Sequence, residues 1–187
     1  MTTNLFNSCD IGLKRGEVIL SRHSKNWATI YTLESSRILE VVEAHLPKFK
    51  LHHIGSTAIR DIVAKPVIDI LGEIDDIKSV DENEQIFKNL GYEYKGEYGI
   101  PGRRYMTLYS LDKEIAYVHI HVFESKSEAF QQHLLFRDLL NHDEKLRLEY
   151  QNLKQMLVEQ KIPRSEYSSA KAEMINKIIK SAKTSTR

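Results

Sequence analysis

Between residues 25 and 46, apolar side chains recur three, four or seven positions apart, a period that predicts an amphipathic helix. Pro47 ends this helix because proline cannot continue the hydrogen-bond ladder. Residues 49–53 alternate apolar and polar side chains and predict a strand. Residues 66–71 are apolar except at Asp69, so this run predicts a buried strand that carries one carboxylate.

Two alternating segments, residues 103–109 and 115–123, flank the turn Leu111-Asp112-Lys113 and predict an antiparallel pair of strands. The other patterns predict a strand at 18–20, a helix at 79–90, a strand at 92–94 and three helices between 127 and 183, the last capped by Ser165. Helices on one face of a mixed sheet, followed by a helical tail, give an α+β fold. The length of 187 residues suits a single domain, with an α+β core at about 18–124 and a helical part at about 127–183.

Charge and cysteine content narrow the class of function. The 27 Lys and Arg residues balance 26 Asp and Glu residues to a net charge of +1, so we expect no general nucleic-acid binding through a positive field. A local basic pocket for one phosphorylated small molecule is compatible with this balance. The single cysteine, Cys9, cannot form an internal disulfide, no run reaches ~20 apolar residues, and the first residues lack the order of a signal peptide. These features predict a cytoplasmic protein that does not enter a membrane.

A cluster of polar residues follows the strand predicted at residues 49–53. Glycine lets the backbone approach an anion closely at Gly55, and the hydroxyls of Ser56 and Thr57 and the ammonium of Lys65 add donors. These four residues are candidates for binding phosphate. A Gly-Ser-Thr sequence is also common in plain turns, so the neighbouring buried strand with its carboxylate is what favours a site here.

Asp69 is the central candidate for chemistry, because a buried carboxylate is costly unless it is paired or binds a metal. As a metal ligand it suits a hard divalent cation such as Mg²⁺ or Mn²⁺. The alternative is a structural role, in which Asp69 caps a loop or pairs with Lys65.

His119 and His121 lie two positions apart on a predicted strand and therefore share a face. Together with Asp69 they are candidate metal ligands, although imidazole favours Mn²⁺, Fe²⁺ or Zn²⁺ over Mg²⁺. They are equally candidates for contact with a phosphate. The alternative is that both histidines lie on the solvent face of an edge strand.

Further polar residues are weaker candidates. His53 shares strand parity with apolar Leu51 and Phe49, so it is the inward candidate of the His52-His53 pair, either in the site or as a satisfied core histidine. Arg103 and Arg104 follow a glycine-rich loop, and a guanidinium binds phosphate well, but parity does not decide which of them points inward. The helical tail adds candidate ligand contacts, which helix-surface polarity explains as well: Arg137, Asp138, Tyr167 and Lys171.

In combination, these motifs resemble the signature of the GrpB-like family. The matching elements are His53-Ile54-Gly55-Ser56-Thr57, Lys65-Pro66, Ile68-Asp69-Ile70, His119-Ile120-His121-Val122, Phe136-Arg137-Asp138, Tyr167 and Lys171. The resemblance runs from about residue 18 to residue 179. This family is similar to the nucleotidyltransferase superfamily, so the resemblance implies a polymerase-beta-like fold. In that fold a Gly-Ser pair opens a helix beside a mixed β-sheet, and the next strand carries an acidic residue.

The resemblance also implies a chemistry, from which this sequence departs. In active members of the superfamily, two carboxylates two positions apart hold two metals that activate a hydroxyl and stabilise the leaving pyrophosphate. With Asp69 as the second of the pair, the first position is Val67, which cannot bind metal, and the third acidic position falls near His119 or His121. Position 61 is Asp, where the family is expected to carry Gly.

Three functions are compatible with the resemblance. The first is a nucleotidyltransferase that uses Mg²⁺ or Mn²⁺ and a nucleoside triphosphate to modify a small-molecule or protein acceptor, with Lys65 or Arg104 offsetting charge. The second is a non-catalytic protein that binds a nucleotide or another phosphorylated metabolite, which Val67 favours. Some relatives are fused to dephospho-coenzyme A kinase, which would link this second function to coenzyme A metabolism. The third is a metal-dependent hydrolase of a phosphorylated substrate.

Overall fold

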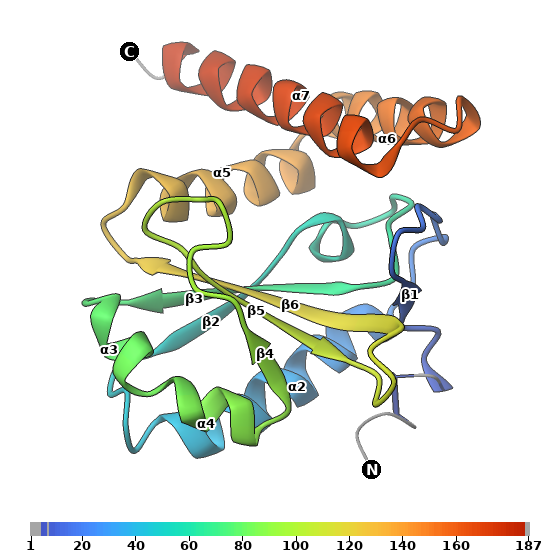
Figure 1. The fold of residues 1–187 in the computed structure, drawn as a ribbon. Coiled ribbons are helices and arrows are strands. Elements are labelled where there is room, and N and C mark those ends of the chain that lie inside the picture. The colour runs from blue at the N-terminus through green and yellow to red at the C-terminus, as the bar shows by residue number, and fades with distance from the viewer. Residues whose placement is uncertain (1–4, 7, 186–187) are drawn as a thin grey trace.

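The structure is a computed structural model that describes residues 5–6 and 8–185, without the side chains of residues 164, 165 and 185. A six-stranded mixed sheet forms the centre, and helices lie on both of its sides (Figure 1). The strands are β1 (Leu13–Lys14), β2 (Lys50–Ile54), β3 (Ile68–Ile74), β4 (Tyr92–Tyr94), β5 (Arg104–Tyr109) and β6 (Ile115–Glu124). The helices are α2 (Asn26–Val42), η1 (Ser56–Ala58), α3 (Lys78–Glu82), α4 (Glu84–Asn89), α5 (Glu128–His142), α6 (Glu144–Glu159) and α7 (Arg164–Ser185).

The sheet order is β2-β3-β6-β5-β4, and β1 pairs with the beginning of β6. Strands β3 and β6 are parallel, whereas the other pairs are antiparallel. In the parallel pair Asp69 lies opposite His119, and across the β2–β3 pair it lies opposite Ile54. Residues directly opposite each other share a face, so the register places Asp69 and His119 on one face of the sheet.

The opposite face of the sheet is apolar and packs against α2 and α4 (Figure 1). From the sheet, the buried side chains on this face include Ile68, Ile70, Met106, Val118, Ile120 and Val122. From α2 they are Trp27, Ile30, Ile38 and Val42, which recur at helical spacing. Full burial of such a side chain contributes roughly 1.5–3 kcal/mol, so this layer is the main source of stability for the sheet.

The face that carries Asp69 is covered in part by α5, with α6 and α7 above it (Figure 1). Leu71 and Phe123 of the sheet pack against Phe130 of α5 in a small apolar cluster. A second cluster joins the three C-terminal helices to Ile59 and Ile62, which follow η1. The helical tail is therefore anchored to the segment that follows the Gly55-Ser56 turn, and it leaves a cavity over the polar part of the sheet.

The α+β expectation is confirmed, and the antiparallel pair around residues 111–113 is present. Several details were wrong. The helix expected at 79–90 is divided into α3 and α4 at Asn83, whose side chain donates to the carbonyl oxygen of Ser79 at 2.9 Å. Residues 18–20 form no strand, and the buried strand begins at Ile68, since the amide of Val67 donates to the carbonyl oxygen of Lys65 in a local turn. Helices cover both faces of the sheet rather than one.

Two other expectations concern single residues. Asp61 adopts φ = 57°, in the left-handed region that glycine favours and that aspartate tolerates. This conformation explains how Asp replaces the expected Gly at position 61. The side chain of Ser165, the expected cap of the last helix, lies outside the described residues. No described helix combines the length and apolar character that crossing a membrane requires.

Candidate functional site

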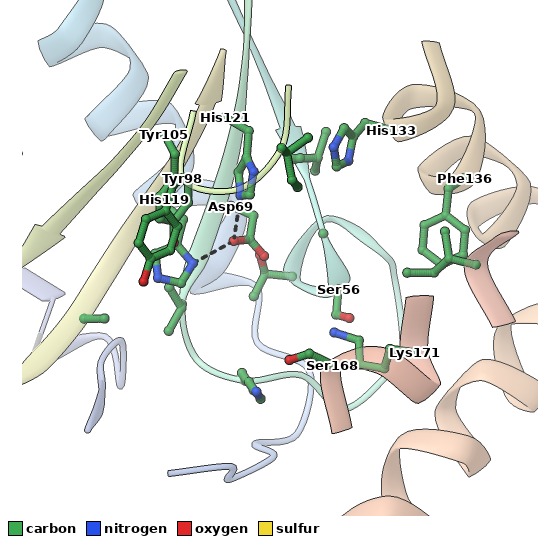
Figure 2. Close-up of a pocket in the computed structure, with 18 of the residues that line it drawn as sticks. Ser56, Asp69, Tyr98, Tyr105, His119, His121, His133, Phe136, Ser168 and Lys171 are labelled. Carbon is green, nitrogen blue, oxygen red and sulfur yellow. Dashed lines mark hydrogen bonds and ion pairs between the residues drawn. The ribbon is translucent and has the colours of Figure 1, made fainter. Parts of the chain in front are cut away.

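A cavity of about 920 Å³ lies between the polar face of the sheet and the C-terminal helices. Figure 2 shows Asp69 near its centre, with His119 and Tyr105 on one side and Ser56 and Lys171 on the other. The motif residues that line the cavity are Gly55, Ser56, Thr57, Lys65, Val67, Asp69, His119, His121, Tyr167 and Lys171. Tertiary structure therefore brings together residues from η1 and the glycine before it, from β3 and the segment that precedes it, and from β6 and α7.

Asp69 and the two histidines of β6 form the centre of the site. The Nδ1 atom of His119 lies 3.1 Å from Asp69 Oδ1, and the Nε2 atom of His121 lies 3.9 Å from the same oxygen. Burial would raise the pKa of Asp69, but the hydrogen bonds and charge of the two histidines outweigh it and lower that pKa well below its usual range. Asp69 is therefore an ionised carboxylate at neutral pH. Because β6 lies between β3 and β5, the interpretation of these histidines as edge-strand residues was wrong.

Gly55 has a specific reason to be glycine. Its φ of 70° lies in the left-handed region, and a Cβ atom there would overlap Oδ2 of Asp69. The turn is completed by hydrogen bonds from the amides of Ala58 and Ile59 to the carbonyl oxygens of Gly55 and Ser56. The Gly-Ser pair therefore opens a helix, as the superfamily resemblance implied, and this helix is the three-residue 3₁₀ turn η1.

One end of the cavity is cationic. The ammonium of Lys65 lies 4.3 Å, and that of Lys171 5.3 Å, from the ring centre of Tyr167. Burial would lower the pKa of Lys171, but Tyr150, Tyr167 and Asp69 together raise it, so this lysine stays protonated at neutral pH. The hydroxyl of Ser56 lies 3.5 Å from that of Tyr150. In the part of the chain that the structure describes, the buried hydroxyl of Tyr167 has no hydrogen-bond partner.

His133 is a site residue that the sequence did not reveal. It projects from α5, with its ring centre 5.8 Å from that of His121 and 5.7 Å from that of Phe123. Burial, and then the charge of His121, lowers the pKa of His133 to about 4. Burial also lowers the pKa of His121. The available signal was helical spacing, since His133 lies three residues from both Phe130 and Phe136, which are buried.

His53 and Arg104 do not lie on the face of the sheet that borders the cavity. His53 shares a face with the apolar core, as parity indicated, but the site is on the other face. Its ring stacks on Tyr31 at 4.6 Å, its Nε2 lies 3.0 Å from Thr57 Oγ1, and burial lowers its pKa to about 4. Arg104 forms a two-point ion pair with Asp81 at 2.6 Å for each bond. Arg104 is therefore held by Asp81 and is not among the residues that line the cavity.

Arg103 and Arg137 do not line the cavity, but they contact residues close to it. Arg103 immediately precedes β5, and its Nη1 atom is 3.4 Å from Nδ1 of His121. Arg137 donates to the carbonyl oxygen of His53 at 3.1 Å and pairs with Asp138 at 2.7 Å, so it fixes the end of β2 to α5. Neither of these two arginines nor Asp138 is among the residues that line the cavity.

The donor set does not fit the expected metal site. Within residues 5–6 and 8–185, no group of three or more His, Cys, Asp or Glu side chains is arranged to hold a metal ion. Val67, which is 5% exposed, lines the cavity two positions before Asp69, where the superfamily has its first carboxylate. One carboxylate and two imidazoles are also a poor match to the oxygen ligands that Mg²⁺ requires. The metal site predicted at Asp69, His119 and His121 therefore has no support in the structure.

The fold belongs to a known class. The chain resembles the Cid1 poly(U) polymerase bound to MgGTP, with a TM-score of 0.54 and 11% identity over 83% of this chain and 47% of that one. The chain thus spans about half of Cid1, and at this identity the likeness shows the fold alone. The crystal structure of the conserved protein GrpB from Enterococcus faecalis is more similar, with a TM-score of 0.70 and 27% identity over 86% of this chain and 99% of that one. The expected nucleotidyltransferase-like fold is confirmed.

A model described as GrpB protein matches residues 17–181, so the chain belongs to the GrpB family. Among its relatives, the glutamate-rich protein GrpB of Alkalihalophilus pseudofirmus is 34% identical over 173 residues, which cover 90% of this chain and 98% of that one. The protein YqkA of Bacillus subtilis is 36% identical over 147 residues, which cover 79% of this chain but 41% of the relative. The family resemblance read from the motifs is confirmed.

Proposed function

We propose that this protein binds a small molecule with a polyphosphate group, of the nucleotide class, in the cavity around Asp69. The main support for this proposal is the positive charge of the cavity wall. Among the described residues that line it, five are cationic and one is a carboxylate, in a chain whose net charge is only +1. The cations are Lys14, Arg15, Lys65, Lys95 and Lys171. Such concentration of positive charge in a concave, partly desolvated wall favours a polyanion.

The phosphates are assigned to the end formed by Gly55, Ser56 and Lys171. Gly55 lets the backbone approach an anion, and Ser56 and Lys171 provide a hydroxyl and an ammonium. The hydroxyl of Tyr167 is buried without a hydrogen-bond partner among the described residues, a state that costs about 1–3 kcal/mol. A phosphate oxygen that accepts from this hydroxyl would remove that cost. The fold neighbour Cid1 was solved with MgGTP and with MgATP, which are ligands of the same class.

The side chains in the cavity support binding of the phosphorylated molecule without two-metal catalysis. Val67 removes one carboxylate of the expected pair, and the imidazoles of His119 and His121 stand near the third position. A buried valine also removes the space and charge that a second metal would need. The site is therefore assigned first to recognition of the phosphorylated molecule.

Metal-free group transfer is a second candidate, which the Asp69–His119 hydrogen bond favours. With Nδ1 of His119 held by Asp69 at 3.1 Å, Nε2 is the ring nitrogen that would accept a proton from an acceptor hydroxyl. The acceptor oxygen would bond to the α-phosphorus, the bond to pyrophosphate would break, and the proton would move to His119. Pyrophosphate release in EDTA, abolished in Asp69→Asn and His119→Gln, is expected for this reaction. Release that depends on an added divalent metal would contradict it.

Binding is tested by calorimetry and thermal shift with ATP, GTP, UTP, dephospho-coenzyme A and inorganic tripolyphosphate, each with Mg²⁺ and with EDTA. A ligand at about 100 times its Kd should add about 2.7 kcal/mol of stability. Lys171→Ala should weaken binding roughly 10- to 150-fold, the range for a charged hydrogen bond. The matched control is Lys177→Ala, an exposed lysine on the same helix, which should bind like the wild type. No binding of any of these anions to folded protein would overturn the proposal.

A further inference from the structure

At the end of the cavity away from Lys171, an exposed tyrosine stacks on a buried one. The rings of Tyr98 and Tyr105 lie 5.2 Å apart and 13° from parallel, and both line the cavity. Tyr98 is 62% exposed, an unusual position for a large aromatic ring that already has one stacking partner. Tyr105 in turn lies 5.6 Å from the ring of His119 (Figure 2). The exposed ring is thus connected through Tyr105 to the centre of the site.

The loop that carries Tyr98 is held in one conformation. Arg103, which is 6% exposed, donates to the carbonyl oxygen of Glu97 at 3.2 Å and to that of Tyr98 at 2.7 Å. Its guanidinium also lies 4.7 Å from the ring centre of Tyr105. Arg103 therefore holds the loop and the ring of Tyr105 together, so the orientation of the Tyr98 ring is set before any ligand binds.

Lys95 also lies close to the stacked rings of Tyr98 and Tyr105. Its ammonium lies 5.1 Å from the ring centre of Tyr98 and 4.9 Å from that of Tyr109, and it donates to the Tyr109 hydroxyl at 2.8 Å. Tyr98 itself has φ = 45°, a left-handed conformation that is unfavourable for a bulky residue. Strain held by surrounding hydrogen bonds at an exposed cavity residue is typical of ligand contacts.

We propose that Tyr98, backed by Tyr105, stacks against the planar base of a nucleotide, so that the ligand of the cavity is a nucleotide and not a polyphosphate alone. This inference rests on the proposed function. In this arrangement the phosphates lie at Lys171, the base lies at Tyr98, and Asp69 lies between them (Figure 2). Because every base has a π face, stacking on Tyr98 selects a planar ring without selecting one base.

The test separates the base from the phosphates. Calorimetry in EDTA measures the Kd of ATP and of inorganic tripolyphosphate for the wild type, Tyr98→Ala and Tyr98→Phe. In parallel, the fluorescence of 2-aminopurine riboside triphosphate reports stacking, because contact with an aromatic ring quenches it. Tyr98 is exposed, so its substitution leaves the fold intact, and Leu111→Ala, at a fully exposed position in the β5–β6 turn, is the surface control.

We expect ATP to bind the wild type more tightly than tripolyphosphate. Tyr98→Ala should weaken ATP roughly 5- to 150-fold and remove the quenching, while the Kd of tripolyphosphate stays unchanged. Tyr98→Phe and Leu111→Ala should keep both the affinity and the quenching. Equal binding of ATP and tripolyphosphate, or full quenching in Tyr98→Ala, would contradict stacking of the base on Tyr98. Either result would leave the proposed phosphate site unaffected. Failure of both ligands to bind the wild type would overturn the proposed function as well.

Discussion

The backbone of Gly55 lies directly against the carboxylate of Asp69: a Cβ atom at position 55 would be 2.9 Å from the Asp69 Cβ and would overlap Oδ2. The β2–β3 register causes this contact, because Ile54 is paired with Asp69 and the chain turns immediately afterwards. The turn assigned to the phosphates and the strand that carries the carboxylate are therefore one structural unit. A change in one must displace the other.

Gly55→Ala should destabilise the protein by about 2–4 kcal/mol, since it adds a steric overlap to an unfavourable φ. Gly99→Ala is the matched control. Gly99 has φ = 81° but no atom within 4 Å of an added Cβ, so it isolates the backbone cost of about 1–2 kcal/mol. Urea denaturation measures both variants. Equal losses in the two variants would show that the contact with Asp69 carries no strain.

His133 should make stability depend on pH between about 4 and 6.5. Burial lowers its folded-state pKa to about 4, so in this window the unfolded chain binds more protons and stability rises with pH. The contribution is complete above the unfolded pKa of about 6.5 and is lost as the pH falls toward 4. His53 acts in the same direction. His133→Gln should therefore lose less stability than the wild type between pH 7 and pH 5 in urea denaturation.

The matched control for His133 is His45→Gln, at an exposed position near the end of α2. This control should reproduce the pH dependence of the wild type. An unchanged pH slope in His133→Gln would mean that the imidazole of His133 is not desolvated in the folded protein.

Lys154 should produce a second pH dependence, in the alkaline range. It is 1% exposed, its ammonium donates to the carbonyl oxygen of Val63, and burial lowers its pKa to about 7. Between pH 7 and the unfolded pKa of about 10.4 the unfolded chain binds more protons, so stability rises with pH. Lys154→Met should flatten this rise, whereas Lys177→Met, at an exposed position on α7, should keep it. Urea denaturation from pH 6 to pH 9 gives the comparison, and a rise that persists in Lys154→Met would refute this pKa.

Val67→Asp should create the carboxylate pair that the superfamily uses. Positions 67 and 69 both line the cavity, and Val67 lies immediately before β3, which carries Asp69. We expect this variant to bind Mn²⁺ in titrations followed by electron paramagnetic resonance, at a cost in stability for the buried charge. Val67→Asn has a similar size without the charge and should not bind the ion. Equal Mn²⁺ binding by the two variants would show that the pair is not formed.

Periodicity along the sequence determined the order of most elements. Alternation of apolar and polar side chains defined the β5–β6 pair, since a period of two residues predicts a strand. The 79–90 segment has a helical pattern, but the break at Asn83 depends on a side-chain hydrogen bond that no pattern predicts. Asp69 was identifiable because a carboxylate inside an apolar run is costly without a partner, and His119 because it shares a strand face with His121.

Only the tertiary structure decided which face of the sheet carries the site. Strand parity correctly grouped His53 with Leu51, but parity does not say whether a shared face meets the core or the cavity. That choice depends on helices distant in sequence, with α2 and α4 filling one face and α5 to α7 leaving a cavity over the other. The same long-range packing placed Arg103 rather than Arg104 beside His121, and it brought His133 and Tyr98 to the site. A sequence pattern records which side chains share a surface, whereas contacts between distant segments determine what that surface meets.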